Sequence, residues 1–387
     1  MQRTVTYLWK EPKAHKAYRS AVCLHGHTNH SKESLYFIVE FASRYTLLRR
    51  ALASQEKRAQ RKSAITVDFW KAYWTPPVPP LSAFQLETRQ IERGLGLASM
   101  VSLTDHDNIE APMLLRVVPE ARQIPVSVEW SVPFRDATFH LGIHNLPSDR
   151  AESIMAELRQ YTKEMSETRL RELLRMLHDD SGTLVVLNHP MWDLADIGKQ
   201  MHYYTLSAFV AEFGMFMHAF EVSGLRPWEE NQEVLQFAEG WNQLAISGGD
   251  RHGCEPSAAL NLTNAESFTE FVHEIRKDRR SHVLFMPHYA EPFNLRILQT
   301  LLDVVRTYPG YPIGSRFWDE RTFHPDRTGT IRPLSAMWEK PPAFIDFFFS
   351  AVRMLEMDPV KKMMQFALAN PERKRRLAFG EGQEVAP

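Results

Sequence analysis

The stretch Val22–Glu33, VCLHGHTNHSKE, places two histidines directly after a short apolar run. The run predicts a β-strand over residues 21–24, and His25 and His27 follow in its last turn. Side chains two residues apart on a strand point to the same side, so both imidazoles can reach one metal ion. Two alternating histidines are more often ordinary surface or core residues, so a metal site requires further ligands elsewhere in the chain.

Further ligand types recur after other short apolar runs. Asp250 and His252, in SGGDRHG, form a second pair with the spacing of the first. Between the two pairs, the segment TDHD, a glutamate, a histidine and an NHP triplet each end such a run. The resulting candidate metal ligands are His25, His27, His106, Glu129, His140, His189, Asp250 and His252.

Strand and helix patterns alternate from residue 21 to about 285. The run LVVL at 184–187 predicts a buried strand, 84–97 has helical spacing, and 151–180 predicts one long charged helix. Residues 1–20 are expected to be a polar lead-in. The alternation predicts parallel strands with crossover helices, in an open sheet or a closed barrel. The carboxyl ends of parallel barrel strands open onto one face, so ligands far apart in sequence would converge there.

The number of ligands indicates more than one ion. A catalytic zinc takes about three protein ligands and a water, so the set suits two ions, or three, with the carboxylate of Glu129 or Asp250 as the bridge. Mixed imidazole and carboxylate ligands favour zinc, manganese or iron over calcium. Two such ions about 4 Å apart activate a hydroxide and stabilise an in-line displacement at phosphorus.

The composition is that of an ordinary globular protein. Lys plus Arg (46) nearly balance Asp plus Glu (47), which leaves a net charge of −1, so no overall field attracts nucleic acid or anionic lipid. No apolar run reaches the roughly 18 residues of a membrane span, and the N-terminal residues lack the apolar core of a signal peptide. Cys23 and Cys254 fit a reducing compartment and are expected to act as small apolar residues. We expect a cytoplasmic protein without membrane association.

The order of these motifs resembles the PHP family, the polymerase and histidinol phosphatase domains. His-x-His-Thr-x-x-Ser, Thr-Asp-His-Asp, Glu-Trp-Ser, His-Leu-Gly-Ile, Asn-His-Pro and Gly-Gly-Asp-Arg-His-Gly follow one another as in that family, from about residue 21 to 285. The resemblance implies an α/β fold, a distorted (β/α)7 barrel that binds two or three divalent ions, and most members are phosphoesterases.

The resemblance also implies how the ligands divide among the ions. The first ion would be held by His25, His27, Glu129 and Asp250. The second ion would be held by Glu129, His140 and His189. His106 and His252 would bind a third ion or the substrate phosphate. Glu129, Asp250 and His252 would be catalytic, because Glu129 bridges the ions while Asp250 or a nearby histidine transfers protons.

The chain departs from the family pattern beside the first motif. Cys23 takes the place of an aspartate two residues before His25. The family often has a ligand for the third ion shortly after the motif serine, where Lys32 and Glu33 stand here. Glu33 could replace that ligand, with His30 as a weaker candidate, whereas Lys32 would favour phosphate over metal.

Other side chains are candidates for roles around the ions. His144 shares a strand face with one of the ligands and could contact substrate. Arg226 and Arg251 follow strand ends, where a guanidinium can bind phosphate oxygens, although surface arginine is the commoner fate. Asp105 is expected to orient His106 or a neighbouring backbone group, as carboxylates behind metal ligands do.

We expect a metal-dependent hydrolase barrel over residues 1–289 and a helical C-terminal extension over 290–387. About 50 residues are inserted near 34–83, between the first two motifs. The insertion begins with helical spacing over 33–53 and continues with basic and then aromatic residues, Lys57, Arg58, Arg61, Lys62, Trp70, Tyr73 and Trp74. A nucleic-acid groove is less favoured for them than a solvated helix face packed on the barrel rim, and a lid over the pocket is a third alternative.

The C-terminal extension contains the apolar segment FIDFFFSAVRML at 344–355. Asp346 and Arg353 interrupt it and it lacks a basic polar face, so it is expected to dock on the barrel or on a second subunit rather than on a membrane. Docking on a second subunit would make the protein a homo-oligomer through these helices.

The favoured function is a metal-dependent phosphoesterase that hydrolyses a phosphomonoester or phosphodiester through metal-activated hydroxide. Its partner would be a small phosphorylated substrate or a nucleotide. One alternative is an amidohydrolase that cleaves a C–N bond, because those barrels also begin with His-x-His. The other is an inactive, metal-stabilised interaction module.

Overall fold

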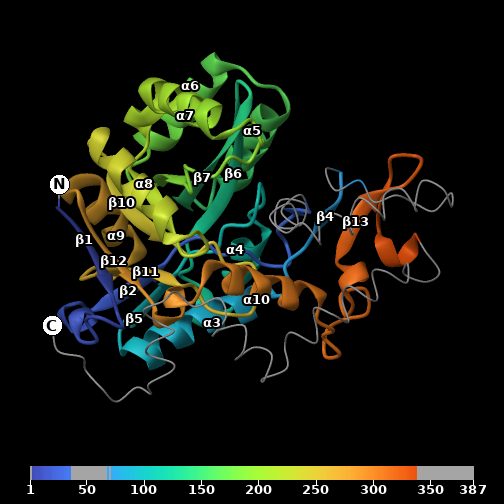
Figure 1. The fold of residues 1–387 in the computed structure, drawn as a ribbon, viewed down its shortest axis with the longest axis horizontal. Coiled ribbons are helices and arrows are strands. Elements are labelled where there is room, and N and C mark those ends of the chain that lie inside the picture. Colours follow the sequence, from blue (N-terminus) through green and yellow to red (C-terminus); the bar gives the residue numbers. More distant parts are fainter. Residues whose placement is uncertain (1, 36–67, 69–70, 338–387) are drawn as a thin grey trace. The chain divides into compact units, whose positions relative to one another are not determined.

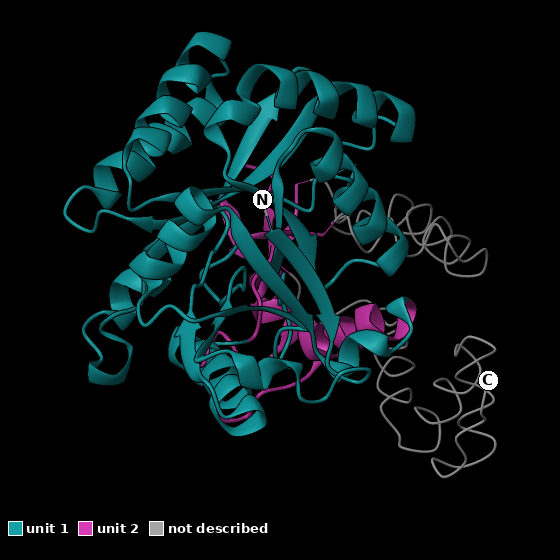
Figure 2. Ribbon diagram, turned by 90° about the vertical axis from the view of Figure 1, so that its left-hand side faces the viewer, with its two compact units in different colours: residues 1–31, 78–293 teal, residues 32–77, 294–387 magenta. Residues whose placement is uncertain are grey.

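The structure of the chain, a computed structural model, describes residues 2–35, 68 and 71–337. The chain divides into two units, shown in Figure 2: residues 1–31 with 78–293, and residues 32–77 with 294–387. Most of the predicted insertion and the segment at 344–355 lie outside the described residues. These outlying residues include 36–53 of the helix predicted over 33–53, and the basic and aromatic residues Lys57, Arg58, Arg61, Lys62 and Trp70. At the start of that predicted helix, Glu33–Ser34 form a short strand instead.

The first unit contains two five-stranded sheets. The first sheet has the order β1-β12-β11-β2-β5. Its strands are β1 (Gln2–Tyr7), β2 (Ser20–Cys23), β5 (Ala98–Val101), β11 (Ala259–Thr263) and β12 (Arg280–Phe285). β2 pairs with β5 and β1 with β12 in parallel, whereas β11 is antiparallel to both neighbours. The expected polar lead-in at 1–20 was wrong for its start, because the polar–apolar alternation of Gln2–Tyr7 forms the edge strand β1.

The second sheet has the order β10-β9-β8-β7-β6. Its strands are β6 (Val126–Phe134), β7 (Ala137–Leu146), β8 (Leu184–Asn188), β9 (Ala219–Ser223) and β10 (Leu244–Gly248). β8, β9 and β10 are parallel, but β7 is antiparallel to β6 and β8. The prediction of parallel strands throughout was therefore wrong. Two residues, Arg135 and Asp136, join β6 to β7, and so short a turn leaves no room for a crossover helix.

The two sheets of the first unit meet through single backbone bridges. Gly26 pairs with Arg251 beyond the ends of β2 and β10, and His106 pairs with Glu129 between the end of β5 and β6. Within the described ranges no continuous ladder joins the sheets, so a closed barrel is not seen. The observed fold is mixed α/β, and the distorted (β/α)7 barrel stays a prediction.

In the first unit, α-helices lie between several of the strands along the chain (Figure 1). They are α3 (Pro80–Arg89), α4 (Glu110–Leu115), α5 (Ala151–Lys163), α6 (Glu167–Asp179), α7 (Lys199–Phe213), α8 (Trp228–Gly240) and α9 (Phe268–His273). α5 and α6 replace the single helix predicted over 151–180. The Ser166 hydroxyl accepts a hydrogen bond from the Arg169 amide and starts a new helix there, as serine favours at this position.

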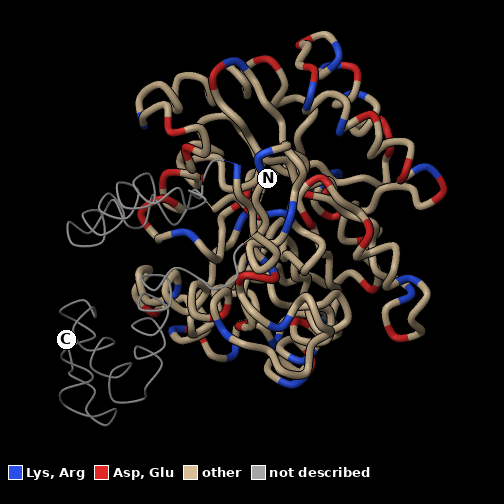
Figure 3. The backbone as a smooth tube through the Cα atoms, turned by 90° about the vertical axis from the view of Figure 1, so that its right-hand side faces the viewer, with Lys and Arg blue, Asp and Glu red and all other residues tan. Residues whose placement is uncertain are grey.

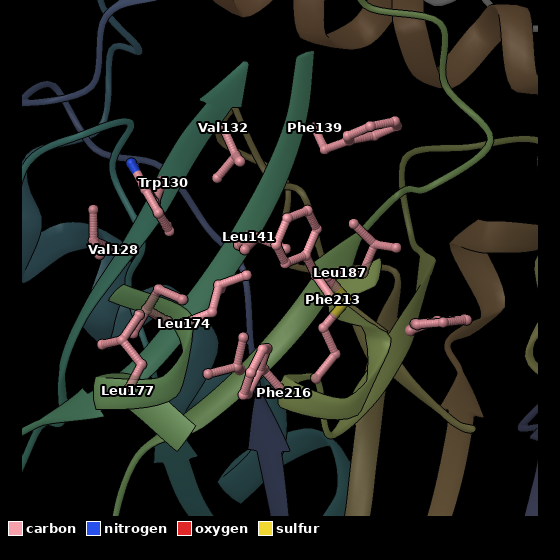
Figure 4. Packing of buried hydrophobic residues seen from close by; sticks show 14 of the residues in the cluster. Val128, Trp130, Val132, Phe139, Leu141, Leu174, Leu177, Leu187, Phe213 and Phe216 are labelled. Atoms are coloured by element: carbon pink, nitrogen blue, oxygen red, sulfur yellow. The ribbon is translucent and has the colours of Figure 1, made fainter. Parts of the chain in front are cut away.

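The largest apolar cluster fills the space between the second sheet and helices α5, α6 and α7. Figure 4 shows Trp130 and Val132 of β6 with Leu141 of β7 and Phe213 of α7. Trp130 is fully buried, and its indole N–H donates to the Leu158 carbonyl at 3.1 Å. This packing fixes β6, which also carries Glu129.

The buried residue His218, just before β9, should make the fold less stable at acid pH. Its Nδ1 accepts a hydrogen bond from the Val185 amide at 2.9 Å. Burial, helped by the positive charge of Arg276, lowers the pKa of His218 to about 3. The unfolded chain takes up the proton near pH 6.5, so this group makes the fold less stable as the pH falls from 6.5 towards 3.

His218→Asn keeps a hydrogen-bond acceptor but cannot titrate in this pH range. Between pH 6.5 and 4.5, the free energy of unfolding of this variant should fall by about 2 kcal/mol less than that of the unmodified protein. Urea unfolding at both pH values measures this, and equal falls in the two proteins would contradict it.

The second unit contains a four-stranded sheet of order β14-β13-β4-β3. Its short antiparallel strands are β3 (Glu33–Ser34), β4 (Tyr73–Trp74), β13 (Thr322–Pro325) and β14 (Ile331–Pro333). α10 (Phe293–Val305) precedes β13. The expected helical extension is thus wrong for part of the described stretch 290–337. Prolines at 325 and 333 end the short strands β13 and β14, which pair with each other, and β13 also pairs with residues 73–74.

Charges of both signs are interspersed along the described chain, as the blue and red positions of Figure 3 show. This distribution agrees with the near-neutral composition. None of the helices in the described ranges has the length and apolar character that crossing a membrane requires.

Candidate metal centre

The carboxylate of Glu129 lies at the centre of the candidate site. Glu129 is the fourth residue of β6 and is fully buried. Its Oε2 is close to three imidazole nitrogens, at 2.9 Å for His25 Nε2, 3.3 Å for His27 Nε2 and 3.4 Å for His106 Nδ1. Its Oε1 is close to two others, at 3.2 Å for His140 Nδ1 and 3.1 Å for His189 Nε2. Each oxygen therefore faces its own set of histidines.

Asp250 approaches part of the same cluster from the end of β10. Its Oδ1 lies 3.5 Å from His25 Nε2, 3.6 Å from His27 Nε2 and 3.5 Å from His252 Nδ1. Its Oδ2 is buried and has no hydrogen-bond partner in the part of the chain that the structure describes. Asp250 thus closes the side of the site formed by the first motif.

The expected ligands lie together, although not all at strand ends. Glu129 and His140 stand inside β6 and β7, because this hairpin extends several residues past the site. His25, His189 and Asp250 do follow strands, each with a positive φ, of 62°, 27° and 51°. Residues other than glycine seldom adopt this conformation, and it concentrates at functional sites. The left-handed backbone occurs where His25 and His189 reach Glu129 and where Asp250 reaches His25 and His27.

The donor set fits divalent metal ions. Three groups of side chains place their nitrogen and oxygen atoms within 4.8 Å of one another: His25, His27 and Glu129; His106, Glu129 and His140; and His27, His106 and His252. Such imidazole and carboxylate sets suit transition metals. The buried Asp250 Oδ2 adds an acceptor that an ion would satisfy.

The buried charges influence one another strongly. Burial alone would raise the pKa of Glu129, but the imidazoles of His25, His106 and His140 lower it well below its ordinary range. Burial likewise disfavours a charged His25, yet Glu129, Glu221 and Asp250 raise its pKa well above the ordinary value. The cluster thus keeps Glu129 ionised, as a metal ligand must be.

Two residues outside the predicted set contact these ligands. Glu221, buried on β9, places Oε2 2.6 Å from His25 Nδ1, so His25 lies between Glu221 and Glu129. Asn188 of β8 donates from Nδ2 to Glu129 Oε1 at 2.9 Å. A carboxylate behind a histidine fixes the ring and leaves its other nitrogen for a metal. The only signal for Glu221 in the sequence is an acidic residue inside an otherwise apolar strand.

Gly248, at the end of β10, makes room for Glu221. A Cβ on Gly248 would lie 2.1 Å from Glu221 Oε2 and 2.3 Å from Cδ, and the carboxylate cannot move without leaving His25. Gly248→Ala should therefore lower the free energy of unfolding by about 2 kcal/mol and weaken metal affinity by about 10–100-fold. In a Glu221→Ala background the same change should cost at least about 1 kcal/mol less. Denaturant unfolding of the four proteins tests this, and additive effects would show that the two residues are independent.

The other sequence candidates have different surroundings. His144 is buried, with Nδ1 2.8 Å from the Ser102 hydroxyl, and burial lowers its pKa to about 3. Asp105 accepts hydrogen bonds from the amide and hydroxyl of Thr28, at 2.6 and 2.7 Å. These two hydrogen bonds hold the backbone beside His27.

Neither predicted phosphate-binding arginine has an uncommitted guanidinium. Arg226 makes two 2.8 Å hydrogen bonds to Glu230. Arg251 is buried and ion-paired with Glu87, which corrects its assignment to substrate. Lys32 and Glu33 belong to the second unit, and their roles stay predictions. Cys23 is buried with Sγ 3.2 Å from the Ser257 hydroxyl, and burial raises its pKa well above the ordinary value.

No family profile and no curated protein matches this sequence. Among solved structures, the chain is similar to an amidohydrolase from Chromobacterium violaceum with bound sulfate and no metal, at a TM-score of 0.33 and 16% identity over 46% of this chain and 83% of that one. It is also similar to a protein from Bifidobacterium adolescentis provisionally described as a metal-dependent phosphoesterase, at a TM-score of 0.31 and 16% identity over 52% of this chain and 91% of that one. Similarity this weak carries no argument about function, so the functional proposal depends on the geometry of the site alone.

Proposed function

We propose that the first unit is a metal-dependent hydrolase of phosphoesters, built as a PHP-type barrel. One observation carries the proposal: a single buried carboxylate, Glu129, presents each oxygen to a different set of imidazoles. A shared carboxylate between two ligand sets is the arrangement that a two-ion centre needs. The substrate would be a small phosphorylated compound or a nucleotide.

The residues divide between two principal positions and a third. His25, His27, Glu129 and Asp250 would hold one ion, and Glu129, His140 and His189 a second. His106 and His252, whose ligand atoms lie near His27, would hold a third. Zinc, manganese or iron bound there would polarise the phosphoryl group and activate a water.

The protein's own groups would position the reaction and move protons. Glu221 and Asn188 orient His25 and Glu129. Glu129 would keep the two ligand sets at a fixed distance from each other. Asp250 and His252, 3.5 Å apart and at the same loop, would take up the proton of the attacking water and return it to the leaving oxygen.

Purified protein supplied with Mn²⁺ or Zn²⁺ and assayed on p-nitrophenyl phosphate, its bis-ester and an amide panel tests the proposal. Phosphoester hydrolysis should be lost in His25→Ala and Asp250→Ala. His282→Asn is the matched control, because His282, on β12, contacts Tyr18 and belongs to none of the ligand groups. Activity that survives both site substitutions would exclude this site, and hydrolysis of amides alone would identify an amidohydrolase. Metal binding with no hydrolysis of any substrate would favour an interaction module.

A further inference from the structure

Arg251 stands between two proposed ligands, Asp250 and His252, but its side chain is directed elsewhere. It is buried, and its three nitrogens all donate within the protein. Nε donates to Glu87 Oε1 at 2.9 Å, Nη1 to the Gly253 carbonyl at 2.8 Å and Nη2 to the His27 carbonyl at 2.9 Å. The guanidinium therefore ties the loop of the first motif to the loop of the last.

Glu87 supplies the counter-charge from helix α3. It is completely buried and accepts the hydrogen bond from Arg251. It also accepts hydrogen bonds from the amide and the hydroxyl of Ser257, at 3.0–3.2 Å. Gly249 leaves space for this arrangement, since a Cβ there would lie 2.1 Å from Ser257 Oγ. A buried ion pair of this kind is retained only when further hydrogen bonds satisfy both partners.

Backbone contacts run through the same residues. The His27 amide donates to the Arg251 carbonyl at 2.9 Å, and Gly26 pairs with Arg251 in the bridge between the two sheets. A change in the Arg251 side chain would thus be transmitted to His27 on one side and to Asp250 and His252 on the other. These three residues are candidate metal ligands that lie close to one another.

We propose that Arg251 and Glu87 form a positioning pair that sets the metal affinity of the side of the centre containing His27, Asp250 and His252. Neither residue belongs to the groups of candidate ligands, and the pair acts by holding two ligand loops at a fixed separation. This inference rests on the metal binding in the proposed function. Partners behind metal ligands commonly contribute 10–100-fold to affinity.

The arrangement requires arginine. Three acceptors in three directions match the planar fork of a guanidinium, whereas the single ammonium of lysine cannot reach them together. Arg251→Lys should therefore keep the charge but release one or both loops. Glu87→Gln keeps the size and an acceptor oxygen while removing the charge.

Titration of the metal-free protein with Mn²⁺ and with Zn²⁺, each alone, provides the test. Arg251→Lys and Glu87→Gln should raise the dissociation constant of at least one ion by about 10–100-fold. Arg276→Lys is the matched control, because Arg276 also donates to three carbonyls, those of Asp180, Thr183 and His178, away from the ligands. It should lower the melting temperature of the metal-free protein without changing the dissociation constants.

The outcomes separate the inference from the proposed function. Wild-type binding with unchanged constants in both variants would overturn the positioning role and leave the metal centre intact. Equal weakening in Arg276→Lys would show a general loss of stability and also overturn it. An unmodified protein that binds neither ion would overturn the proposed function and this inference together. If Arg251→Lys does not fold, the dissociation constants of the Glu87→Gln protein alone test the positioning role.

Discussion

Replacement of Glu129 by glutamine should lower kcat/KM for phosphoester hydrolysis by at least about 10³-fold, which corresponds to about 4 kcal/mol of transition-state stabilisation. Glutamine has nearly the same shape but no charge and only one oxygen. Each oxygen of this carboxylate faces its own set of imidazoles, so glutamine would leave one set without an oxygen ligand and give the other only a neutral one. Steady-state kinetics at saturating Mn²⁺ and metal analysis of the purified variant measure the effect.

Glu110→Gln is the matched control for this substitution. Glu110 is an exposed glutamate at the start of α4 that pairs with His30 at 2.9 Å, and its change should leave the kinetics and the metal content unaltered. A Glu129→Gln protein with full metal content and full activity would contradict the shared-carboxylate centre.

The sequence could indicate which residue types gather at the site, but not how the backbone brings them there. His25 and His27 were expected to point the same way because they alternate on a strand. In the structure β2 ends at Cys23, and His25 has a φ of 62°. Both rings reach Glu129 Oε2 through this turn rather than through strand alternation.

Residues that support the ligands from a distance have no local signature. Arg251 was a candidate phosphate ligand because it follows a strand end, although surface arginine is the commoner fate. In the structure it is buried and contacts Glu87, which lies 164 residues away in the chain. Glu221 is hidden in an apolar strand in the same way. Contacts of this range arise from packing, so spacing and composition cannot predict them.

The topology shows the same division. Alternation of strands and helices predicted an α/β fold, and buried runs such as Leu184–Asn188 are strands. The direction of β7 depends on the two-residue turn before it, and the pairing of β11 depends on its neighbours in space. Local pattern defines an element, whereas its partners follow from how the whole sheet packs.

Removal of the ions by a chelator should lower the melting temperature of the first unit by at least about 5 °C. An ion present at 100 times its dissociation constant stabilises the native state by about 2.7 kcal/mol, and each kcal/mol corresponds to about 2–4 °C for a domain of this size. The ion-free centre also leaves five imidazoles packed around one buried carboxylate, without the cations that such donors suit.

Thermal unfolding with excess Mn²⁺ and with EDTA measures this difference. Glu129→Gln provides the internal comparison, because a protein in which neither ligand set keeps the charged carboxylate should melt at nearly the same temperature in the two buffers. The unmodified protein should regain its higher melting temperature when Mn²⁺ is returned, since metal binding is linked to folding. Equal melting temperatures of the unmodified protein with and without the ion would mean that the histidines around Glu129 do not bind it.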